Sequence, residues 1–406
     1  MVRKRQGKMG YNKKTYELGS KRSVIREIFE YSKKRAAEIG HENVFDFSLG
    51  NPSIPAPTDV NDTIRELLLT ENSVSLHGYT SAQGDAGVRE TISDSIKRRF
   101  GVENITKDHI YMTCGAAASL SICLKAVVES PDDECIVFAP FFTEYRVFIE
   151  NAGAKMVVSQ PDAKTFQIDV ADFESKISPN TKAVIVNSPN NPSGVVYSEQ
   201  TIISLCDILR KKSAEFGHVI YLIADEPYRE LVYSGVDVPY LMNYYKNTLV
   251  CYSFSKSLSL PGERIGYIAV CPDMDESEDI YLSVCGAGRA LGYVCAPSLF
   301  QQVVARCVDL TADVNIYREN RDLLYNNLSS YGYECVKPDG AFYLFVKALE
   351  KDAYKFAQNA RAHEILVVPC DDFGVEGYIR IAYCTDKSTV LGALPAFRAL
   401  AEEYKK

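Results

Sequence analysis

Three segments of the sequence carry side chains that could do chemistry, and each directly follows a short apolar run. "KAVIV" precedes "NSPNNPSG", "VIYLIA" precedes "DEPYRE", and "TLVCY" precedes "SFSKSLSLPGER". The third segment places Lys256 among serines, with Arg264 eight residues later. A lysine in a partly desolvated pocket beside a cation can be neutral near neutral pH and can attack an aldehyde. Serine hydroxyls and an arginine are suited to hold a phosphate.

An aldehyde that carries a phosphate is typical of pyridoxal 5'-phosphate, a cofactor whose pyridine nitrogen needs an anionic partner. Asp225 is the candidate for that anion, and Tyr228 and Asn191 are candidate donors to the phenolic oxygen of the ring. Each segment also has an ordinary structural explanation, as a turn, a helix cap or a solvated lysine. Their occurrence after three successive apolar runs favours one shared site.

The stretch "MTCGAAASLSICLKAVV" is a further candidate for phosphate binding. It has the pattern of a strand, a glycine and the first turn of a helix. Backbone N–H groups at a helix start are free to bind anions. The residues concerned are Gly115, Ala116 and Ala117.

Seven short apolar runs between residues 109 and 270 are predicted to be the strands that position these groups. They are apolar on nearly every residue, as in strands buried on both faces, and they alternate with helical stretches. The runs are "HIYMT", "ECIVFA", "KMVVS", "KAVIVN", "HVIYLIAD", "TLVCYS" and "RIGYIAV". This pattern predicts an α/β protein with a large doubly wound, mostly parallel sheet, which binds ligands beyond the carboxyl ends of its strands.

The two ends of the chain are predicted to form a second, smaller α/β domain. We expect helices over residues 23–39, over 294–328 and through "VLGALPAFRALAEEY", with strands at "GAFYLFV", "EILVVP" and "YIRIAY". The predicted small domain therefore comprises residues 16–50 and 290–406. A large cofactor-binding domain is expected over residues 51–289, and a disordered basic arm over residues 1–15.

Composition and charge argue against several classes of protein. The chain has 406 residues, of which 46% are hydrophobic and 24% charged, and its formal net charge is -8. Such a chain has no electrostatic reason to bind nucleic acid, and no apolar run approaches the roughly 20 residues of a membrane span. Its 12 cysteines form no C-x-x-C pair. We therefore expect reduced thiols in a cytoplasmic protein without a metal site.

These segments resemble the class I and II aminotransferases, aspartate-aminotransferase-like members of the fold-type I pyridoxal phosphate enzymes. The lysine signature of that family has Ser-x-Ser/Gly/Ala-Lys followed by Gly-x-Arg-apolar-Gly, and here it reads "SFSKSLSLPGERIG" from Ser253 to Gly266. The resemblance also covers "YTSAQGDAGVRETI", "NNPSG", "DEPY", "PDGAFYLF" and "YIRIAY". It implies pyridoxal 5'-phosphate as cofactor and a homodimer with shared active sites.

The resemblance implies a role for each matching residue. Lys256 is expected to bind the cofactor covalently and to move a proton between the α-carbon of the substrate and C4′ of the cofactor. Asp225 is expected at the ring nitrogen, Tyr228 and Asn191 at the phenolic oxygen, and Asn191 also at the substrate. The expected phosphate-binding residues are Ser253, Ser255, Arg264, Gly115, Ala116 and Ala117.

Four further positions match the family in the same way. Phe142 in "APFFTEY" is expected to stack on the cofactor ring, with the neighbouring Phe141 as an alternative. Tyr79 in "GYTSAQG" is expected to reach the phosphate in the neighbouring subunit. Arg380 in "YIRIAY" would hold the substrate α-carboxylate through two parallel hydrogen bonds. Gly50 in "SLGNPS" would let the backbone approach the substrate.

The predicted reaction is transfer of an amino group from an L-amino acid to a 2-oxo acid such as 2-oxoglutarate. Aspartate is one candidate donor, and Arg289 in "GAGRALGYVCAP" would then bind its side-chain carboxylate across the subunit interface. A helix-surface arginine is the ordinary alternative. Elimination, as in carbon–sulfur lyases and cyclopropane-forming synthases, uses the same fold and cofactor and stays open as an alternative activity. A non-catalytic regulatory module fits less well, because all the chemical positions are occupied. A nicotinamide dehydrogenase lacks its G-x-G-x-x-G signal here.

Overall fold

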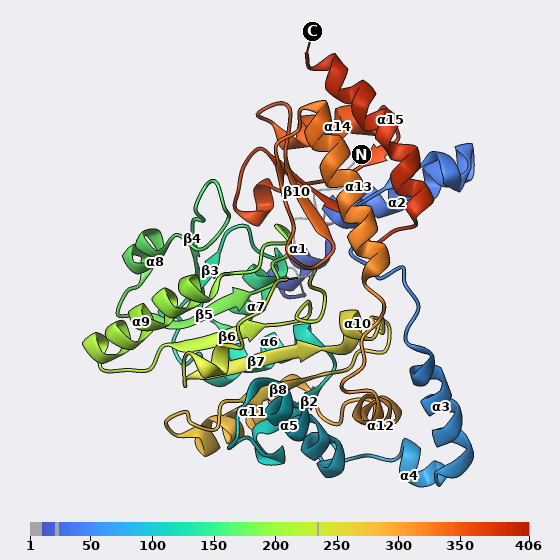
Figure 1. The fold of residues 1–406 in the computed structure, drawn as a ribbon. Coiled ribbons are helices and arrows are strands. Elements are labelled where there is room, and N and C mark those ends of the chain that lie inside the picture. Colours follow the sequence, from blue (N-terminus) through green and yellow to red (C-terminus); the bar gives the residue numbers. More distant parts are fainter. Residues whose placement is uncertain (1–9, 21–23, 234, 406) are drawn as a thin grey trace.

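The computed structural model describes residues 10–20, 24–233 and 235–405, and it has the α/β architecture that the sequence predicts (Figure 1). The described helices are α1 (Lys13–Ser20), α2 (Val24–Ile39), α3 (Thr58–Thr70), α4 (Ser73–His77), α5 (Ala86–Phe100), α6 (Ala116–Val127), α7 (Glu144–Ala152), α8 (Val170–Lys176), α9 (Glu199–Phe216), α10 (Phe254–Ser257), α11 (Ser277–Leu291), α12 (Ser298–Arg306), α13 (Asn315–Tyr331), α14 (Ala353–Arg361) and α15 (Lys387–Glu403).

All seven apolar runs are strands of one sheet, so this prediction is confirmed. They are β2 (Ile110–Thr113), β3 (Glu134–Phe138), β4 (Lys155–Ser159), β5 (Thr181–Asn187), β6 (Tyr221–Asp225), β7 (Thr248–Ser253) and β8 (Gly266–Val270). Their order is β2-β8-β7-β6-β5-β3-β4. The neighbours from β7 through to β4 run parallel, whereas β8 is antiparallel to both β2 and β7.

Burial explains why these runs form the centre of the sheet. In β5, the side chains of Val184, Ile185 and Val186 are each at most 2% exposed. Burying a side chain of this size contributes roughly 1.5–3 kcal/mol, so consecutive apolar residues favour a strand covered on both faces. The helix α6 packs against β7 and β8, and α11 packs on α6. The polar residue Asn187 is the last residue of β5 and is itself buried, at 5% exposure.

The helix predicted over residues 23–39 is observed as α2 over Val24–Ile39, and residue 23 lies outside the described residues. The helix in "AGVRETISDSIKRRFG" is α5. Its N-terminus is capped by Asp85, whose side chain accepts a hydrogen bond from the backbone N–H of Val88 at 3.0 Å. It ends at Gly101, which has a left-handed backbone with φ of 70°. A positive φ at a helix C-terminus favours glycine, which explains the stop.

A second sheet lies above the first in Figure 1, within the orange and red part of the chain. Its strands are β9 (Cys335–Val336), β10 (Tyr343–Lys347), β12 (Val368–Pro369) and β13 (Tyr378–Ala382), in the order β12-β13-β10-β9. A separate parallel pair joins β1 (Phe45–Asp46) to β11 (Ile365–Leu366). The packing of α13, α14 and α15 beside these strands forms a second hydrophobic core.

The structure differs from the sequence prediction at two helices. The long helix expected over residues 294–328 is two helices, because the chain leaves α12 at Arg306 and the backbone N–H of Ala312 donates to the carbonyl of Ser257 at 2.7 Å. The predicted disordered arm overlaps α1, which begins at Lys13 because the Asn12 side chain accepts from the N–H groups of residues 14 and 15. Residues 1–9 of that arm lie outside the described residues.

The predicted domain boundaries stay predictions. Several contacts depart from them. One set involves α12, which is assigned by sequence to the small domain and packs against α3, α4 and α5. Its buried residues Val303 and Val304 belong to the core of the large sheet. Within the described part of the chain, no helix is both long and apolar enough to cross a lipid bilayer.

Candidate active site

A cavity of about 320 Å³ lies beyond the carboxyl ends of β5, β6 and β7, and it gathers the groups that follow these strands. It is also bordered by the start of α6 and by residues from the second sheet. The predicted residues at its surface are Gly50, Ala116, Ala117, Phe142, Asn191, Asp225, Tyr228, Ser253, Ser255, Lys256, Arg264 and Arg380. Segments more than 300 residues apart in the sequence therefore meet at one place.

Asp225 is the last residue of β6, and its carboxylate is 4% exposed. The hydroxyl of Tyr145 donates to its Oδ2 at 2.5 Å, and the amide of Asn187 donates to its backbone carbonyl at 2.9 Å. Its Oδ1 has no hydrogen-bond partner among the described residues. Burial raises the pKa of Asp225 to about 7, while donation by Tyr145 lowers it and the nearby Glu226 raises it. A cationic N–H donor at Oδ1 would therefore find a buried, incompletely paired acceptor.

Lys256 lies in α10, the short helix that follows β7. Its Nζ donates to the backbone carbonyl of Gly50 at 2.6 Å. Burial lowers the pKa of Lys256 to about 8, Cys384 opposes this, and the cations Arg264 and Arg380 lower the pKa further. With this pKa, about a tenth of the amine is neutral at pH 7, and the neutral form is the one that attacks carbonyl carbon.

The groups predicted to hold a phosphate meet between α10 and α6. The hydroxyl of Ser253 donates to that of Ser255 at 2.8 Å, and Nη1 of Arg264 lies 3.5 Å from the Ser255 oxygen. A Cβ at Gly115 would lie 2.9 Å from Nη2 of Arg264, and Gly115 has a φ of 88°. Glycine thus suits both the backbone and the close approach of the guanidinium to the N-terminus of α6.

Arg380 in β13 is 3% exposed and is held by two other segments. Its Nη1 donates to Oδ1 of Asn191 at 3.1 Å, and its Nη2 donates to the carbonyl of Ser48 at 2.7 Å. Its Nε has no hydrogen-bond partner among the described residues. Because the Asn191 oxygen accepts from Arg380, the Asn191 amide nitrogen is left to donate to a ligand.

The two aromatic candidates of "APFFTEY" point to different places. Phe142 lines the cavity that contains Lys256, and its ring meets Tyr145 edge-on with centroids 5.7 Å apart. Phe141 lines a separate cavity of about 810 Å³ between α1, α2, α7 and residues 368–374. The geometry therefore favours Phe142 over Phe141 as the residue beside a bound ring.

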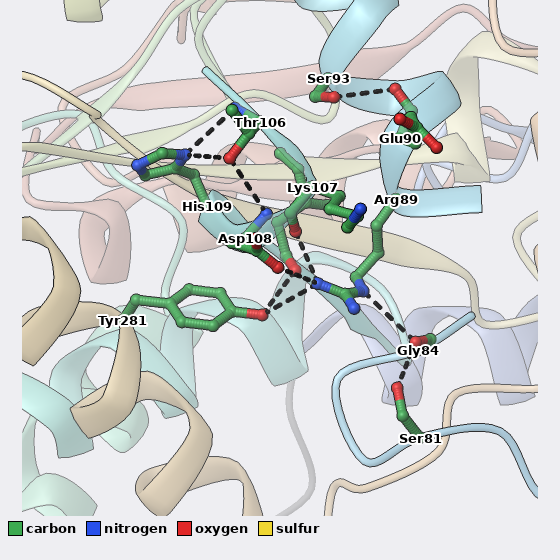
Figure 2. Close-up of polar contacts among 11 residues, drawn as sticks. Ser81, Gly84, Arg89, Glu90, Ser93, Thr106, Lys107, Asp108, His109 and Tyr281 are labelled. Carbon is green, nitrogen blue, oxygen red and sulfur yellow. Dashed lines mark hydrogen bonds and ion pairs between the residues drawn. The ribbon is translucent and has the colours of Figure 1, made fainter. Parts of the chain in front are cut away.

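Tyr79 does not reach the cavity of its own chain, since its side chain is 98% exposed. The loop after it is nevertheless held firmly (Figure 2). The buried Arg89 donates to the carbonyl of Gly84 at 3.3 Å and to that of Lys107 at 2.6 Å, and Ser81 donates to the same Gly84 carbonyl. The ring of Tyr79 therefore lies at the surface, outside the cavity of its own chain.

Arg289 also lies away from the cavity. It is near the end of α11, and its side chain is exposed. Neither Tyr79 nor Arg289 is therefore placed at the cavity by this chain alone.

The described residues contain no group of three or more His, Cys, Asp or Glu side chains that could hold a metal ion.

Sequence reasoning missed several residues that contact the predicted ones. Tyr145 pairs with Asp225, Asn187 holds the Asp225 backbone, and Tyr343 pairs with Tyr228, with the two hydroxyl oxygens 2.9 Å apart. Only weak signals pointed to them. Asn187 ends the apolar run "KAVIVN", and Tyr343 lies in the segment "PDGAFYLF".

Comparison with known proteins supports one family. The family model "Aminotransferase class I and II" matches residues 42–396. An amino transferase from Eubacterium rectale, known from its crystal structure, is 55% identical, with a TM-score of 0.96 over 98% of this chain and 100% of that one. The aspartate aminotransferase of Thermotoga maritima is 29% identical over 91% of this chain and 95% of its own length. Aromatic-amino-acid aminotransferase 2 of Thermococcus litoralis is 26% identical over 94% of this chain and 96% of its own length.

Proposed function

The chain belongs to the class I and II aminotransferases, and on that basis we propose which of its residues perform the reaction. It is a pyridoxal-phosphate-dependent enzyme that transfers an amino group from an amino acid to a 2-oxo acid. One observation carries the assignment of residues. A buried carboxylate oxygen of Asp225 without a partner among the described residues and the amine of Lys256 border the same cavity.

The side chains around the cavity fit this cofactor at both of its ends. Oδ1 of Asp225 suits a protonated pyridine nitrogen, because burial strengthens the attraction between the two charges. Ser253, Ser255 and Arg264, together with the start of α6, suit the phosphate. When bound, the cofactor supplies an electron sink that stabilises negative charge on the α-carbon of the substrate.

In this proposal Lys256 would hold the resting cofactor covalently and would be released when the amino group of the substrate takes its place. The freed Nζ would then act as the base that takes the proton from the α-carbon of the substrate and returns it on the cofactor side. The pKa of about 8, lowered mainly by burial, suits both directions of this transfer, because a general base works best with a pKa near the operating pH. Tyr228 and Asn191, which line the same cavity, would donate to the phenolic oxygen of the ring, and Phe142 would pack on its face.

Substrate orientation is assigned to the segments that hold Arg380. Its guanidinium is fixed by Asn191 and Ser48, so it is already oriented before a carboxylate arrives. Orienting a group in advance reduces the entropy lost on binding. The backbone of Gly50, whose carbonyl accepts from Lys256, forms the wall beside the substrate.

The proposed assembly is a homodimer in which Tyr79 of each chain reaches the phosphate bound in the other. The exposed ring on a braced loop supports this. Arg289 is proposed to approach the substrate side chain across the same interface if the donor is aspartate. The relatives named above act, by their names, on aspartate and on aromatic amino acids, so 2-oxoglutarate as acceptor and the identity of the donor remain part of the proposal.

We also propose a division into a small domain of residues 16–50 and 290–406 and a large domain of residues 51–289. The two hydrophobic cores support it because most residues of each core lie in one proposed domain. The exceptions include α12, Phe345 and Val368 in the core of the large sheet, and Tyr228 and Tyr233 in the other core. A cytoplasmic location is supported by the 12 cysteines, all of which are free thiols in the structure.

The test of the residue assignment is Lys256→Ala. We expect the variant to bind pyridoxal 5'-phosphate through the phosphate and Asp225, but to lose turnover by more than the roughly 10²–10⁴-fold that a general base contributes. The measurement is keto acid formation with each amino acid supplied singly, together with the visible absorbance of the bound cofactor. That series also identifies the amino donor.

Lys246→Ala is the matched control. Lys246 is an exposed lysine that pairs with Asp275 at 2.7 Å, far from the cavity, so its removal should leave turnover unchanged. Wild-type turnover in Lys256→Ala would refute the assignment of the base.

A further inference from the structure

Tyr343 in β10 touches three of the groups assigned above, and none of the assignments gives it a role. Its hydroxyl oxygen lies 2.9 Å from that of Tyr228. Its ring faces the guanidinium of Arg380, with Cζ of the arginine 4.6 Å from the ring centroid. Its hydroxyl also abuts Gly50, where an added Cβ would lie 2.0 Å from the Tyr343 oxygen. Tyr343 itself is 3% exposed, so these contacts are made away from bulk water.

The direction of the hydrogen bond between the two tyrosines follows from counting protons. A phenol has one proton to donate, and Tyr228 can give its proton either to Tyr343 or to a ligand. The phenolic oxygen of the bound cofactor is an acceptor that needs donors. If Tyr228 donates to that oxygen, the 2.9 Å contact survives only with Tyr343 as its donor.

We propose that Tyr343 is a positioning residue that donates its hydroxyl proton to Tyr228 and thereby commits the single proton of Tyr228 to the phenolic oxygen of the cofactor. The inference rests on the proposed role of Tyr228. Hydrogen bonds in a chain polarise one another, so a Tyr228 that accepts from Tyr343 is a stronger donor than one that does not. Tyr343 is thus expected to set how readily the lysine-bound cofactor takes up a proton.

The surroundings restrict Tyr343 to this geometry. The rings of Tyr228 and Tyr343 are nearly perpendicular, at 78°, and both also meet Phe342 edge-on. Burial raises the pKa of both tyrosines. The charged groups that face Tyr228 are Arg380, which lowers its pKa, and Asp225, which raises it. Arg380 also lowers the pKa of Tyr343, and Cys384 raises it. Glycine at position 50 leaves the space that the Tyr343 hydroxyl occupies.

The experiment follows the visible absorbance of the holoenzyme as a function of pH, because this band changes when the lysine-bound cofactor gains or loses its proton. Four proteins are compared: wild type, Tyr228→Phe, Tyr343→Phe and the double variant. Loss of a donor to the phenolic oxygen raises the proton affinity of the bound cofactor. We expect Tyr343→Phe to raise the midpoint by about 0.3–1 pH unit, less than Tyr228→Phe does.

The double variant separates positioning from a general structural effect. In the Tyr228→Phe background, Tyr343→Phe should add no further shift, because Tyr343 acts through the missing hydroxyl. Tyr233→Phe is the matched control: the Tyr233 hydroxyl donates to the carbonyl of Ala341 at 2.7 Å and lies 3.0 Å from the Tyr383 hydroxyl, in a buried pair that does not line the cavity. Its midpoint should equal that of wild type.

Gly50→Ala provides a second route that keeps both hydroxyls. Its Cβ would displace the Tyr343 oxygen, so the midpoint should rise in the same direction as in Tyr343→Phe. The proposal is overturned if Tyr343→Phe and Gly50→Ala both leave the midpoint at the wild-type value, or if the shift persists in full without the Tyr228 hydroxyl. If Lys256→Ala keeps the pH-dependent band of wild type, the assignment of Lys256 fails instead, and the two failures are distinguishable.

Discussion

Replacing Tyr145 with phenylalanine should weaken the hold of the enzyme on the pyridine nitrogen of its cofactor without disturbing the phosphate. Tyr145 donates to Oδ2 of Asp225 at 2.5 Å, and both side chains are at most 4% exposed. The substitution removes one oxygen and preserves the ring that meets Phe142. What is lost is therefore a single hydrogen bond to a buried carboxylate.

The magnitude follows from that bond. A hydrogen bond to a charged group contributes roughly 1.5–3 kcal/mol, which corresponds to about 10- to 150-fold in binding. The sign follows from the pKa of Asp225, which burial raises to about 7 and which Tyr145 lowers. Without Tyr145 the pKa rises further, so more of the carboxyl is protonated at neutral pH. A neutral carboxyl no longer attracts the pyridinium.

The assay is equilibrium binding of the apoenzyme to pyridoxal 5'-phosphate and to an analogue in which a C–H group replaces the ring nitrogen. Tyr145→Phe should lose about 10- to 150-fold with the natural cofactor and less than about twofold with the analogue, which has no nitrogen to pair with Asp225. Tyr245→Phe is the control, since Tyr245 also donates a buried hydrogen bond, to the carbonyl of Ile220 at 2.8 Å. Equal losses with both ligands, or no loss with either, would refute the reasoning.

Three further outcomes are expected. The rate at which the apoenzyme binds the cofactor covalently should rise with pH and level off above about pH 8, because burial lowers the pKa of Lys256 and only the neutral amine reacts. Stopped-flow absorbance measures this rate. A rate independent of pH would contradict the prediction. Arg380→Lys should lower kcat/KM by about 10- to 150-fold, since an ammonium cannot form two parallel hydrogen bonds with a carboxylate. Steady-state kinetics with one amino donor measures this change, and an unchanged kcat/KM would contradict the prediction. Glu226→Gln should lower the free energy of unfolding by about 3–5 kcal/mol in denaturant titrations, because it removes the carboxylate charge that pairs with the buried Arg229 guanidinium. A change below about 1 kcal/mol would count against this.

The strands that carry the site were predictable because the information is local. Runs such as "KAVIV" and "TLVCY" are buried on both faces, and the polar residues that follow them mark the edge of the sheet. Asp225 and Lys256 could be assigned to one site from this pattern alone. The large sheet and its mostly parallel order followed from the same runs.

The contacts that support those residues could not be predicted, since they depend on packing between distant segments. Tyr145 reaches Asp225 across 80 positions of sequence, and Tyr343 reaches Tyr228 across 115. Nothing in the local pattern distinguishes either tyrosine from an ordinary core aromatic. The break between α12 and α13 was missed for a related reason. The backbone N–H of Ala312 donates to the carbonyl of Ser257, a residue distant in the sequence, and not to a carbonyl of α12.

The loop that Arg89 braces has a consequence for how the enzyme behaves at low concentration. Tyr79 is 98% exposed, and the loop that follows it is held by the hydrogen bond from Arg89 to Gly84, so its ring can contact a neighbouring subunit. If Tyr79 of each subunit contacts the phosphate bound in the other, dilution that separates the two subunits removes one phosphate contact from each of the two active sites. Specific activity should then fall as the enzyme is diluted, and excess cofactor should restore part of it.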